Sequence, residues 1–408
     1  MSNPVTSEVK ELAQEQALYP QEQLAKVKEE DASLLLGIPN EISMQETRLL
    51  LTPASVSVLA ANGHRVLIEA GAGESSKFSD NEYSEAGAKI VYSAQEAYDA
   101  QIVLKVEPPT PKEIEYLKPG STLISALQLG NRTPDYFRAI NKKKITALAF
   151  EFIEDKVGGM PVVRAMSEIA GSTVINIAAH YLSSVSDGRG TILGGISGVP
   201  PTRVVILGAG TVGEFAARAA LGMGAQVQVF DNQLYKLRRL KHALGQPVYT
   251  STMDISTLSD ALEMADVVIG AVRPEKGTNR LVVTEEMVAN MKAESVIVDV
   301  SIDQGGCVET SEITTTSKPV FRKFNVIHYC VPNIASRVAR TATTAFSNIF
   351  TPILLQVSDV GGVDEMIYHH KWFMRGVYAY RGSLTNAAIA RKFKMSHRDL
   401  DLLMAARL

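Results

Sequence analysis

The chain has 408 residues, of which 46% are hydrophobic and 21% charged, and its formal net charge is −3 at pH 7. This length exceeds one ordinary hydrophobic core, so two globular domains are expected, and the small net charge argues against nucleic acid or an anionic membrane as a partner. The two cysteines, Cys307 and Cys330, form no CxxC pair and no metal-ligand cluster, which argues against disulfides or a metal site and favours the cytoplasm.

The first 31 residues differ in composition from the rest of the chain. They are rich in Glu, Gln and Lys, which predicts a charged N-terminal extension in the form of a frayed amphipathic helix or a tail. No basic segment is followed by an apolar one, so no signal peptide is expected. No apolar run approaches the roughly 20 residues that span a bilayer, so no membrane span is expected either.

Strand-like segments then follow one another along the chain. They are short, apolar on both faces and rich in β-branched residues, which is typical of buried parallel strands joined by helices. The pattern predicts an α/β fold with two doubly wound parallel sheets of the Rossmann type. The first series covers residues 34–38, 65–69, 102–106, 122–126 and 146–152, and the second covers 203–207, 226–231, 267–272, 296–300 and 326–330.

Two helical stretches bracket the second series of strands. The first covers residues 161–182 and is followed by a glycine-rich loop at 187–201, and the second covers 336–355. Helices on both sides indicate that one domain is inserted into the other. We predict a substrate-binding catalytic domain made of residues 32–161 and 340–408, and a nucleotide-binding domain made of residues 162–339.

A glycine motif opens the second series of strands. An apolar strand leads into Gly208-Ala-Gly210-Thr211-Val212-Gly213, and a helix-forming run follows. In this fingerprint Gly208 allows a tight turn, Gly210 lets the backbone approach a pyrophosphate and Gly213 lets the helix pack on the sheet. The amides of Thr211, Val212 and Gly213 at the start of the helix would face the phosphates.

Asp231 indicates which dinucleotide is bound. It ends the strand predicted at 226–231, where a carboxylate can accept hydrogen bonds from ribose hydroxyls and would repel the 2′-phosphate of NADP. Lys236, Arg238 and Arg239 lie downstream and weaken this preference a little. The sequence predicts NAD as the cofactor.

Several separated segments together form a combination that is highly specific for one protein family. They lie at residues 37–41, 46–53, 69–74, 104–106, 166–171, 298–307 and 329–333. Through them the chain from about Leu34 onward resembles the family of alanine dehydrogenase and the NAD-binding subunit of proton-translocating transhydrogenase. Ser-Glu-Ile-Ala-Gly at 167–171, the 187–201 loop and Ile-Asp-Gln-Gly-Gly-Cys at 302–307 look like the alanine dehydrogenase branch. The run at 336–339 is similar to the transhydrogenase branch.

The resemblance places Arg48 and Lys105 on the substrate. A guanidinium can hold an α-carboxylate bidentately, and an ammonium can bind the carboxylate and polarise a developing carbonyl. The structural alternatives are a surface salt bridge for Arg48 and a solvated amine at a strand edge for Lys105.

Further residues are assigned to the cofactor and to the chemistry by the same resemblance. Asp303 follows the strand at 296–300, so its carboxylate is expected at the sheet edge beside the nicotinamide, with a loop-capping role as the alternative. Residues that match the family's NAD contacts are Ser167, Lys236, Asn333 and the backbone at Val272.

Gln128 departs from the alanine dehydrogenase pattern. That branch carries a catalytic His at this position, and the transhydrogenase branch carries Gln. A glutamine cannot exchange a proton near pH 7, so Gln128 can only orient substrate or water by hydrogen bonding. Acid–base work then falls on Asp303, on Lys105 with a lowered pKa, or on water between them; burial would lower the pKa of Lys105 and a nearby carboxylate would raise it.

Together the motif and the resemblance imply reversible NAD-dependent oxidative deamination of L-alanine to pyruvate and ammonium. The alternatives are a dehydrogenase for another small amino acid, a soluble hydride-transfer component related to transhydrogenase, and an NAD-binding regulatory protein without catalysis. A homo-oligomer, possibly a hexamer, is expected from the family.

Overall fold

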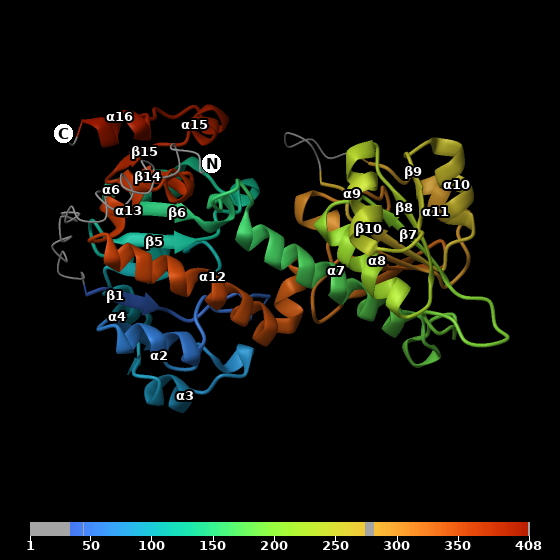
Figure 1. The fold of residues 1–408 in the computed structure, drawn as a ribbon, viewed down its shortest axis with the longest axis horizontal. Coiled ribbons are helices and arrows are strands. Elements are labelled where there is room, and N and C mark those ends of the chain that lie inside the picture. Colours follow the sequence, from blue (N-terminus) through green and yellow to red (C-terminus); the bar gives the residue numbers. More distant parts are fainter. Residues whose placement is uncertain (1–32, 44, 274–280, 407–408) are drawn as a thin grey trace, which may run out of the picture.

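The computed structural model describes residues 33–43, 45–273 and 281–406, which form two lobes joined by long helices (Figure 1). The N-terminal extension predicted at residues 1–31 lies outside the described residues. Within the described ranges, no helix is both long and apolar enough to cross a bilayer.

The first lobe is built on an eight-stranded sheet of order β15-β14-β6-β5-β4-β1-β2-β3. The strands from β6 to β3 are parallel, whereas β14 and β15 extend the β6 edge in antiparallel pairing. The bounds are β1 Leu35–Ile38, β2 Arg65–Glu69, β3 Lys89–Val91, β4 Ile102–Leu104, β5 Thr122–Ser125, β6 Thr146–Ala149, β14 Val377–Tyr380 and β15 Ser383–Leu384.

The second lobe is built on a seven-stranded sheet of order β12-β13-β11-β10-β7-β8-β9. All neighbours are parallel except the edge strand β12, which pairs antiparallel with β13. The bounds are β7 Arg203–Leu207, β8 Gln226–Phe230, β9 Tyr249–Ser251, β10 Val267–Gly270, β11 Val296–Asp299, β12 Val320–Lys323 and β13 Val326–Tyr329.

Helices cover both faces of each sheet. In the first lobe they are α2 Pro53–Ala61, α3 Asp80–Glu85, α4 Ala94–Tyr98, α5 Pro111–Tyr116, α6 Pro134–Lys142, α13 Val363–His369, α14 Lys371–Met374, α15 Ala387–Phe393 and α16 Leu400–Ala405. In the second they are α8 Thr211–Gly222, α9 Leu234–Leu244, α10 Ile255–Glu263 and α11 Glu285–Ala289. The long helix α7 Pro161–Leu182 runs from one lobe to the other (Figure 1). The long helix α12 Ala339–Asp359 packs on the core of the first lobe.

Strand β7 shows why the sheets are covered on both sides. Val204 and Ile206 belong to one buried cluster, with residues of α7 and α8, while Val205 and Leu207 belong to another, with residues of α10 and α11. Successive side chains of a strand point to opposite faces, so a strand that is apolar throughout needs helices on both sides. The predicted fold of two doubly wound, mainly parallel sheets is confirmed.

Several predicted bounds differ from the structure. The strand predicted at 146–152 ends at Ala149, because the chain turns into the 3₁₀ helix η3 (Phe150–Phe152). The helix predicted at 336–355 begins later, at Ala339, after the 3₁₀ helix η7 (Ile334–Val338), and continues to Asp359. The short strands β3, β9 and β12 were not predicted because, as edge strands, they are partly exposed and lack the apolar pattern.

Gly171 lets α7 approach the start of α8 closely. A Cβ at this position would lie 2.4 Å from the carbonyl oxygen of Val212 and 2.7 Å from Cβ of Phe215. Because Val212 lies in the first turn of α8, the packing of α7 sets the position of the helix end that follows the glycine motif.

We therefore expect Gly171→Val to lower the melting temperature and to reduce the free energy of unfolding by about 1–3 kcal/mol, because the added side chain forces α7 and α8 apart. Gly222→Ala in α8 is the control: no atom lies within 4 Å of its Cβ position, so this change should leave the melting temperature equal or higher. Thermal unfolding followed by circular dichroism measures both, and an unchanged melting temperature for Gly171→Val would contradict the packing argument.

Candidate active site

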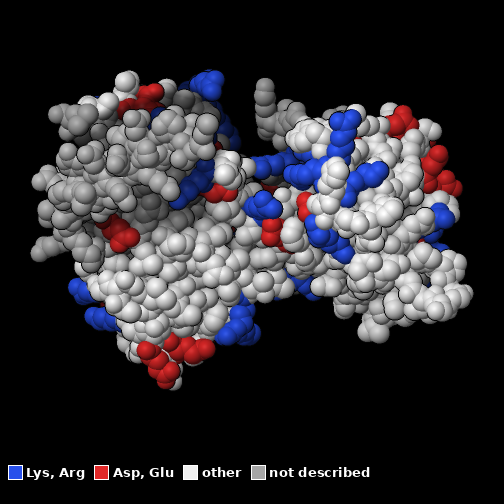
Figure 2. Space-filling view, in the orientation of Figure 1, with Lys and Arg blue, Asp and Glu red and all other residues white. Residues whose placement is uncertain are grey.

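A cleft of about 380 Å³ lies between the two lobes, where carboxyl ends of strands from both sheets meet (Figure 2). Such edges are where ligands bind in parallel α/β proteins. A larger hollow of about 480 Å³ beside η7 contains only Asn333 of the predicted residues, so size alone does not select the site. Six of the predicted residues line the cleft: Arg48, Ser167, Val212, Val272, Asp303 and Asn333.

The glycine motif has the geometry of a dinucleotide loop. A Cβ on Gly208 would lie 2.4 Å from the carbonyl oxygen of Ala271, and one on Gly213 would lie 1.9 Å from the carbonyl oxygen of Gly208. Gly208 also has a backbone φ of +105°, which residues other than glycine rarely adopt. No atom lies within 4 Å of the Cβ position of Gly210, so that side of the loop is open, and α8 begins at Thr211 directly behind it.

Asp231 follows β8 and is buried. Its Oδ2 accepts a hydrogen bond from the backbone N–H of Ala209 at 2.8 Å, and its Oδ1 accepts one from Gln233 at 2.8 Å. Arg239 donates to the carbonyl oxygen of Ala209 at 3.0 Å, so one basic residue of α9 contacts the glycine loop. Lys236 lies in the first turn of α9, and its proposed contact with the cofactor stays a prediction.

Figure 2 shows Lys and Arg side chains gathered over the position of α9, at the rim of the hollow between the lobes. The α9 sequence explains this concentration, because its polar face carries Lys236, Arg238, Arg239 and Lys241. A dinucleotide carries a negatively charged pyrophosphate, so a basic rim is compatible with one.

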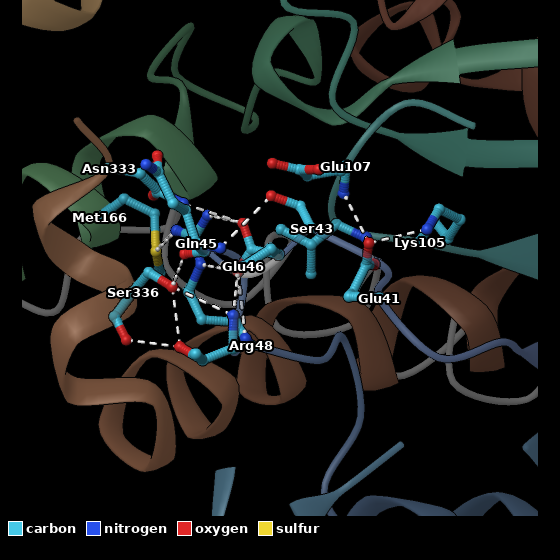
Figure 3. A network of polar contacts seen from close by, with 12 residues as sticks. Glu41, Ser43, Gln45, Glu46, Arg48, Lys105, Glu107, Met166, Asn333 and Ser336 are labelled. Atoms are coloured by element: carbon cyan, nitrogen blue, oxygen red, sulfur yellow. Dashed lines mark hydrogen bonds and ion pairs between the residues drawn. The ribbon is translucent and has the colours of Figure 1, made fainter. Parts of the chain in front are cut away.

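Arg48 forms a buried ion pair with Glu46 rather than a surface salt bridge (Figure 3). Its Nε donates to Oε1 of Glu46 at 2.7 Å and its Nη2 donates to Oε2 at 2.6 Å, which is a bidentate geometry. The remaining terminal nitrogen, Nη1, lies 3.3 Å from Sδ of Met166, and the guanidinium carbon lies 5.4 Å from the Phe346 ring centroid. The pairing with Glu46 therefore fixes the direction of Nη1.

The same region holds the two lobes together. Glu46 accepts a further hydrogen bond from Nδ2 of Asn333 at 2.9 Å. Next to it, the hydroxyl of Thr47 donates to the carbonyl oxygen of Ser336 at 2.6 Å. Asn333 follows β13 of the second sheet, so these contacts join the start of η7 to the segment after β1.

Lys105 is buried just beyond β4 and is not among the residues that line the cleft. Its Nζ lies 2.8 Å from Oε2 of Glu41 and 3.1 Å from Oε1 of Glu113. Burial lowers the pKa of Lys105, but the two carboxylates outweigh burial and raise that pKa above its ordinary value. Lys105 is therefore a permanent cation at neutral pH, which does not favour a role as proton acceptor.

The two carboxylates beside Lys105 are not equivalent. Burial raises the pKa of Glu41 to about 7, although the charge and hydrogen bond of Lys105 oppose the shift. Burial also acts on Glu113, yet Lys105 and the hydrogen bonds from Thr110 hold the pKa of that carboxyl below its ordinary value. Glu41 is thus the member of this cluster that changes charge near neutrality.

Asp303 lies in the 3₁₀ helix η6 (Val300–Gln304), directly after β11. Its Oδ1 accepts a hydrogen bond from the backbone N–H of Asn333 at 2.9 Å. The side chain reaches the solvent in the cleft but is crowded by protein, and this loss of hydration raises its pKa, with the Asn333 hydrogen bond and the charge of Arg48 opposing the shift. A carboxyl group with a raised pKa is suited to exchange protons.

Gln128 is exposed and lies outside the set of cleft-lining residues. Its backbone is left-handed, with φ 47° and ψ 55°, and its N–H lies 3.3 Å from Oε1 of Glu151. Glu151 does line the cleft, although the sequence analysis did not single it out. Its signal in the sequence is an acid at the end of an apolar strand.

Four carboxylates, Glu41, Glu46, Glu113 and Glu151, are the residues that the sequence analysis missed. Glu41 and Glu46 stand inside segments that carried the family resemblance, but nothing in those segments shows which cation each would meet. Among the described residues there is no group of three or more His, Cys, Asp or Glu side chains that could hold a metal ion.

The two carboxylates of the Lys105 cluster should change stability in different pH windows. Because the pKa of Glu41 is raised from 4.5 to about 7 in the folded state, the folded state binds more protons between these values, and stability falls as the pH rises from about 4.5 to 7. Glu41→Gln should remove this slope, which amounts to a change in the free energy of unfolding on the order of 1–3 kcal/mol across the window. Urea unfolding between pH 2.5 and 8 measures it.

Glu113→Gln is the matched control for that measurement. The lowered pKa of Glu113 stabilises the folded state above 4.5, and this contribution is lost as the pH falls below that value. Glu113→Gln should therefore alter the pH slope at the acid end, and the same window for both variants would contradict the assignment.

Comparisons with known proteins agree with this geometry. The family model described as "Alanine dehydrogenase/PNT, N-terminal domain" matches residues 37–170, and the one described as "Alanine dehydrogenase/PNT, C-terminal domain" matches residues 174–387. The chain is 39% identical to the alanine dehydrogenase of Methanococcus maripaludis over 360 residues, which are 88% of this chain and 96% of that protein.

Two solved structures extend the comparison. One is an L-alanine dehydrogenase, with 35% identity and a TM-score of 0.83, matched over 88% of this chain and 99% of the other. The other is a transhydrogenase from Sinorhizobium meliloti, with 24% identity and a TM-score of 0.74 over 87% and 99%, a likeness of fold. The chain belongs to the alanine dehydrogenase/PNT family.

Proposed function

We propose that the protein is an alanine dehydrogenase, which converts L-alanine, NAD⁺ and water reversibly to pyruvate, ammonium and NADH. The observation that carries the proposal is the cleft in which Arg48 of the first lobe and Asp303 and Asn333 of the second lobe meet beside the glycine loop. Such a cleft offers an anchor for a carboxylate, an acid–base group and a dinucleotide site together. The identity to alanine dehydrogenases over most of the chain supports the same assignment.

The loop at Gly208–Gly213 fits NAD. The open side of Gly210 gives a pyrophosphate access to the backbone, and the first amides of α8 face that position. The carboxylate of Asp231 disfavours a 2′-phosphate at the ribose. When bound, NAD⁺ supplies the acceptor for the hydride from the substrate Cα. Ser167, Lys236, Val272 and Asn333 are the further contacts that we propose for it.

Arg48 is the proposed anchor for the substrate carboxylate. Glu46 occupies Nε and Nη2, so the guanidinium is held in place while Nη1 points toward the Met166 side of the cleft. A fixed guanidinium costs less entropy on binding than a mobile one. Lys105 is the second proposed cation, kept charged by its two carboxylate neighbours.

Asp303 is the proposed acid–base residue. Its carboxyl group can take a proton from the water that adds to the oxidised Cα, and its raised pKa brings it nearer to the working pH. Gln128 would orient that water or the amino group by hydrogen bonding. Closure of the lobes over the cleft would exclude bulk water from these steps.

The proposal includes the domain organisation predicted from the sequence. Residues 32–161 and 340–408 would form the catalytic domain, and residues 162–339 the NAD domain inserted into it. The addition of β14 and β15 to the first sheet supports the return of the chain to that domain. The proposed assembly is a homo-oligomer, and a hexamer is the form expected from the family.

The test of the function is a panel of L-amino acids, each mixed with the purified full-length chain and NAD⁺, with NADH followed by its absorbance. We expect the highest kcat/KM with L-alanine, and NADH consumption with pyruvate plus ammonium. Arg48→Lys should lower kcat/KM for alanine tenfold or more, because a lysine cannot keep the bidentate pair with Glu46 that directs Nη1 into the cleft.

Arg164→Lys is the control for Arg48→Lys, because Arg164 is an exposed residue of α7 that pairs with Glu168. A higher kcat/KM for another amino acid would move the assignment to that substrate. The proposal would be replaced by a hydride-transfer component under two conditions. No amino acid forms NADH above the background and pyruvate plus ammonium consumes none, while hydride is exchanged between NADH and an oxidised analogue.

The cofactor assignment predicts that Asp231→Asn lowers the ratio of kcat/KM for NAD⁺ over NADP⁺ by about tenfold or more, because the negative charge that opposes a 2′-phosphate is removed. Asparagine keeps an oxygen that can accept a hydrogen bond from Ala209. Asp260→Asn, at an exposed position of α10, is the control. An unchanged cofactor ratio would show that Asp231 does not select NAD.

A further inference from the structure

Glu151 is a half-buried acid at the cleft that the proposed mechanism does not use. It lies in η3, immediately after β6, and lines the same cleft as Arg48 and Asp303. The carboxyl edge of the first sheet thus places an ionisable group opposite the acid that follows β11 of the second sheet.

The two oxygens of Glu151 have different surroundings. Oε1 accepts hydrogen bonds from the backbone N–H groups of Leu127 at 2.8 Å and Gln128 at 3.3 Å. Oε2 is buried and has no hydrogen-bond partner within the part of the chain that the structure describes. A buried polar atom without a partner costs free energy, so its retention at a ligand cleft calls for an explanation.

Glu151 also controls the position that carries Gln128. The left-handed backbone of Gln128 is uncommon for a residue with a side chain, and the hydrogen bond to Oε1 of Glu151 is one of the contacts that hold it. Gln128 itself cannot exchange protons near neutral pH. A titratable carboxyl group therefore lies directly behind the place where the family resemblance expects a titratable imidazole.

Among the described residues, the groups that face Glu151 leave Oε2 without a hydrogen-bond partner. On the protein side, Tyr136 of α6 and Tyr378 of β14 bind each other through their hydroxyls at 3.0 Å, and Arg132 precedes α6. Across the cleft, Arg48 is paired with Glu46, and Asp303 accepts a hydrogen bond from Asn333. Burial raises the pKa of Glu151, and the hydrogen bonds from Leu127 and Gln128 oppose the shift.

We propose that Glu151 is a catalytic proton acceptor for the substrate's α-ammonium group, which rests on the proposed amino-acid dehydrogenase function. The ammonium N–H bond breaks, its electron pair stays on nitrogen, and an O–H bond forms at Oε2. The neutral amine can then donate its lone pair to Cα as the hydride leaves. In the reverse direction the carboxyl group returns the proton, and between turnovers the half-buried side chain exchanges it with water in the cleft that it lines.

The test compares Glu151→Gln and Glu151→Asp with the wild-type chain. Glutamine keeps an oxygen for the N–H groups of Leu127 and Gln128 but cannot take a proton. We expect kcat for alanine oxidation to fall about 100-fold or more in Glu151→Gln, with the melting temperature and the NADH affinity unchanged. The acid limb of the kcat/KM pH profile should move in this variant and should persist in Glu151→Asp, which keeps part of the activity.

Glu154→Gln is the matched control, because Glu154 lies three residues further on and binds Arg375 outside the cleft. An active wild type with Glu151→Gln within threefold of it, and with the same pH profile, would overturn the role of Glu151 alone. A loss of kcat that Glu151→Asp does not restore, with an unmoved acid limb, would overturn it in favour of a structural role. A wild type that oxidises no amino acid of the panel would overturn the proposed function and this inference together.

Discussion

The buried ion pair between Glu46 and Arg48 is the contact on which the arrangement of the site depends. Two charges removed from water are stable together only where each is satisfied by the other and by further hydrogen bonds. Glu46 meets this condition by accepting from Arg48 with both oxygens and from Asn333 of the second lobe. The pair therefore orients the guanidinium in the cleft and ties the two lobes together at the same point.

Lys105 follows the same principle with a different balance of charges. Two carboxylates share one ammonium, and they keep Lys105 protonated. Burial instead raises the pKa of one of the two acids, Glu41. The cluster thus adjusts its net charge through a carboxyl group rather than through the amine. The cation therefore keeps its charge at neutral pH because its carboxylate neighbours outweigh the effect of burial.

The sheets could be predicted from the sequence because buried parallel strands are apolar on both faces. The glycine motif could be predicted because Gly208 and Gly213 are required by local steric contacts and Gly210 leaves space for a ligand. The pairing of charges could not. Lys105 meets Glu41 from 64 residues earlier in the chain, and Glu46 meets Asn333 from 287 residues later. Such partners are determined by which strand ends converge, and no local spacing records that. The order of the strands, with β1 between β4 and β2, is what brings Glu41 to Lys105.

Gln128 and Glu151 show how the fold can bring a titratable group to a position whose own side chain does not titrate. Taken alone, a glutamine at this position cannot exchange a proton near neutral pH. The structure places the carboxyl group of Glu151 against the backbone of the same residue, so the local fold that presents position 128 also presents an acid. Since β5 and β6 are adjacent parallel strands, the segments that follow them meet at one edge, and the two positions are coupled by topology rather than by sequence distance.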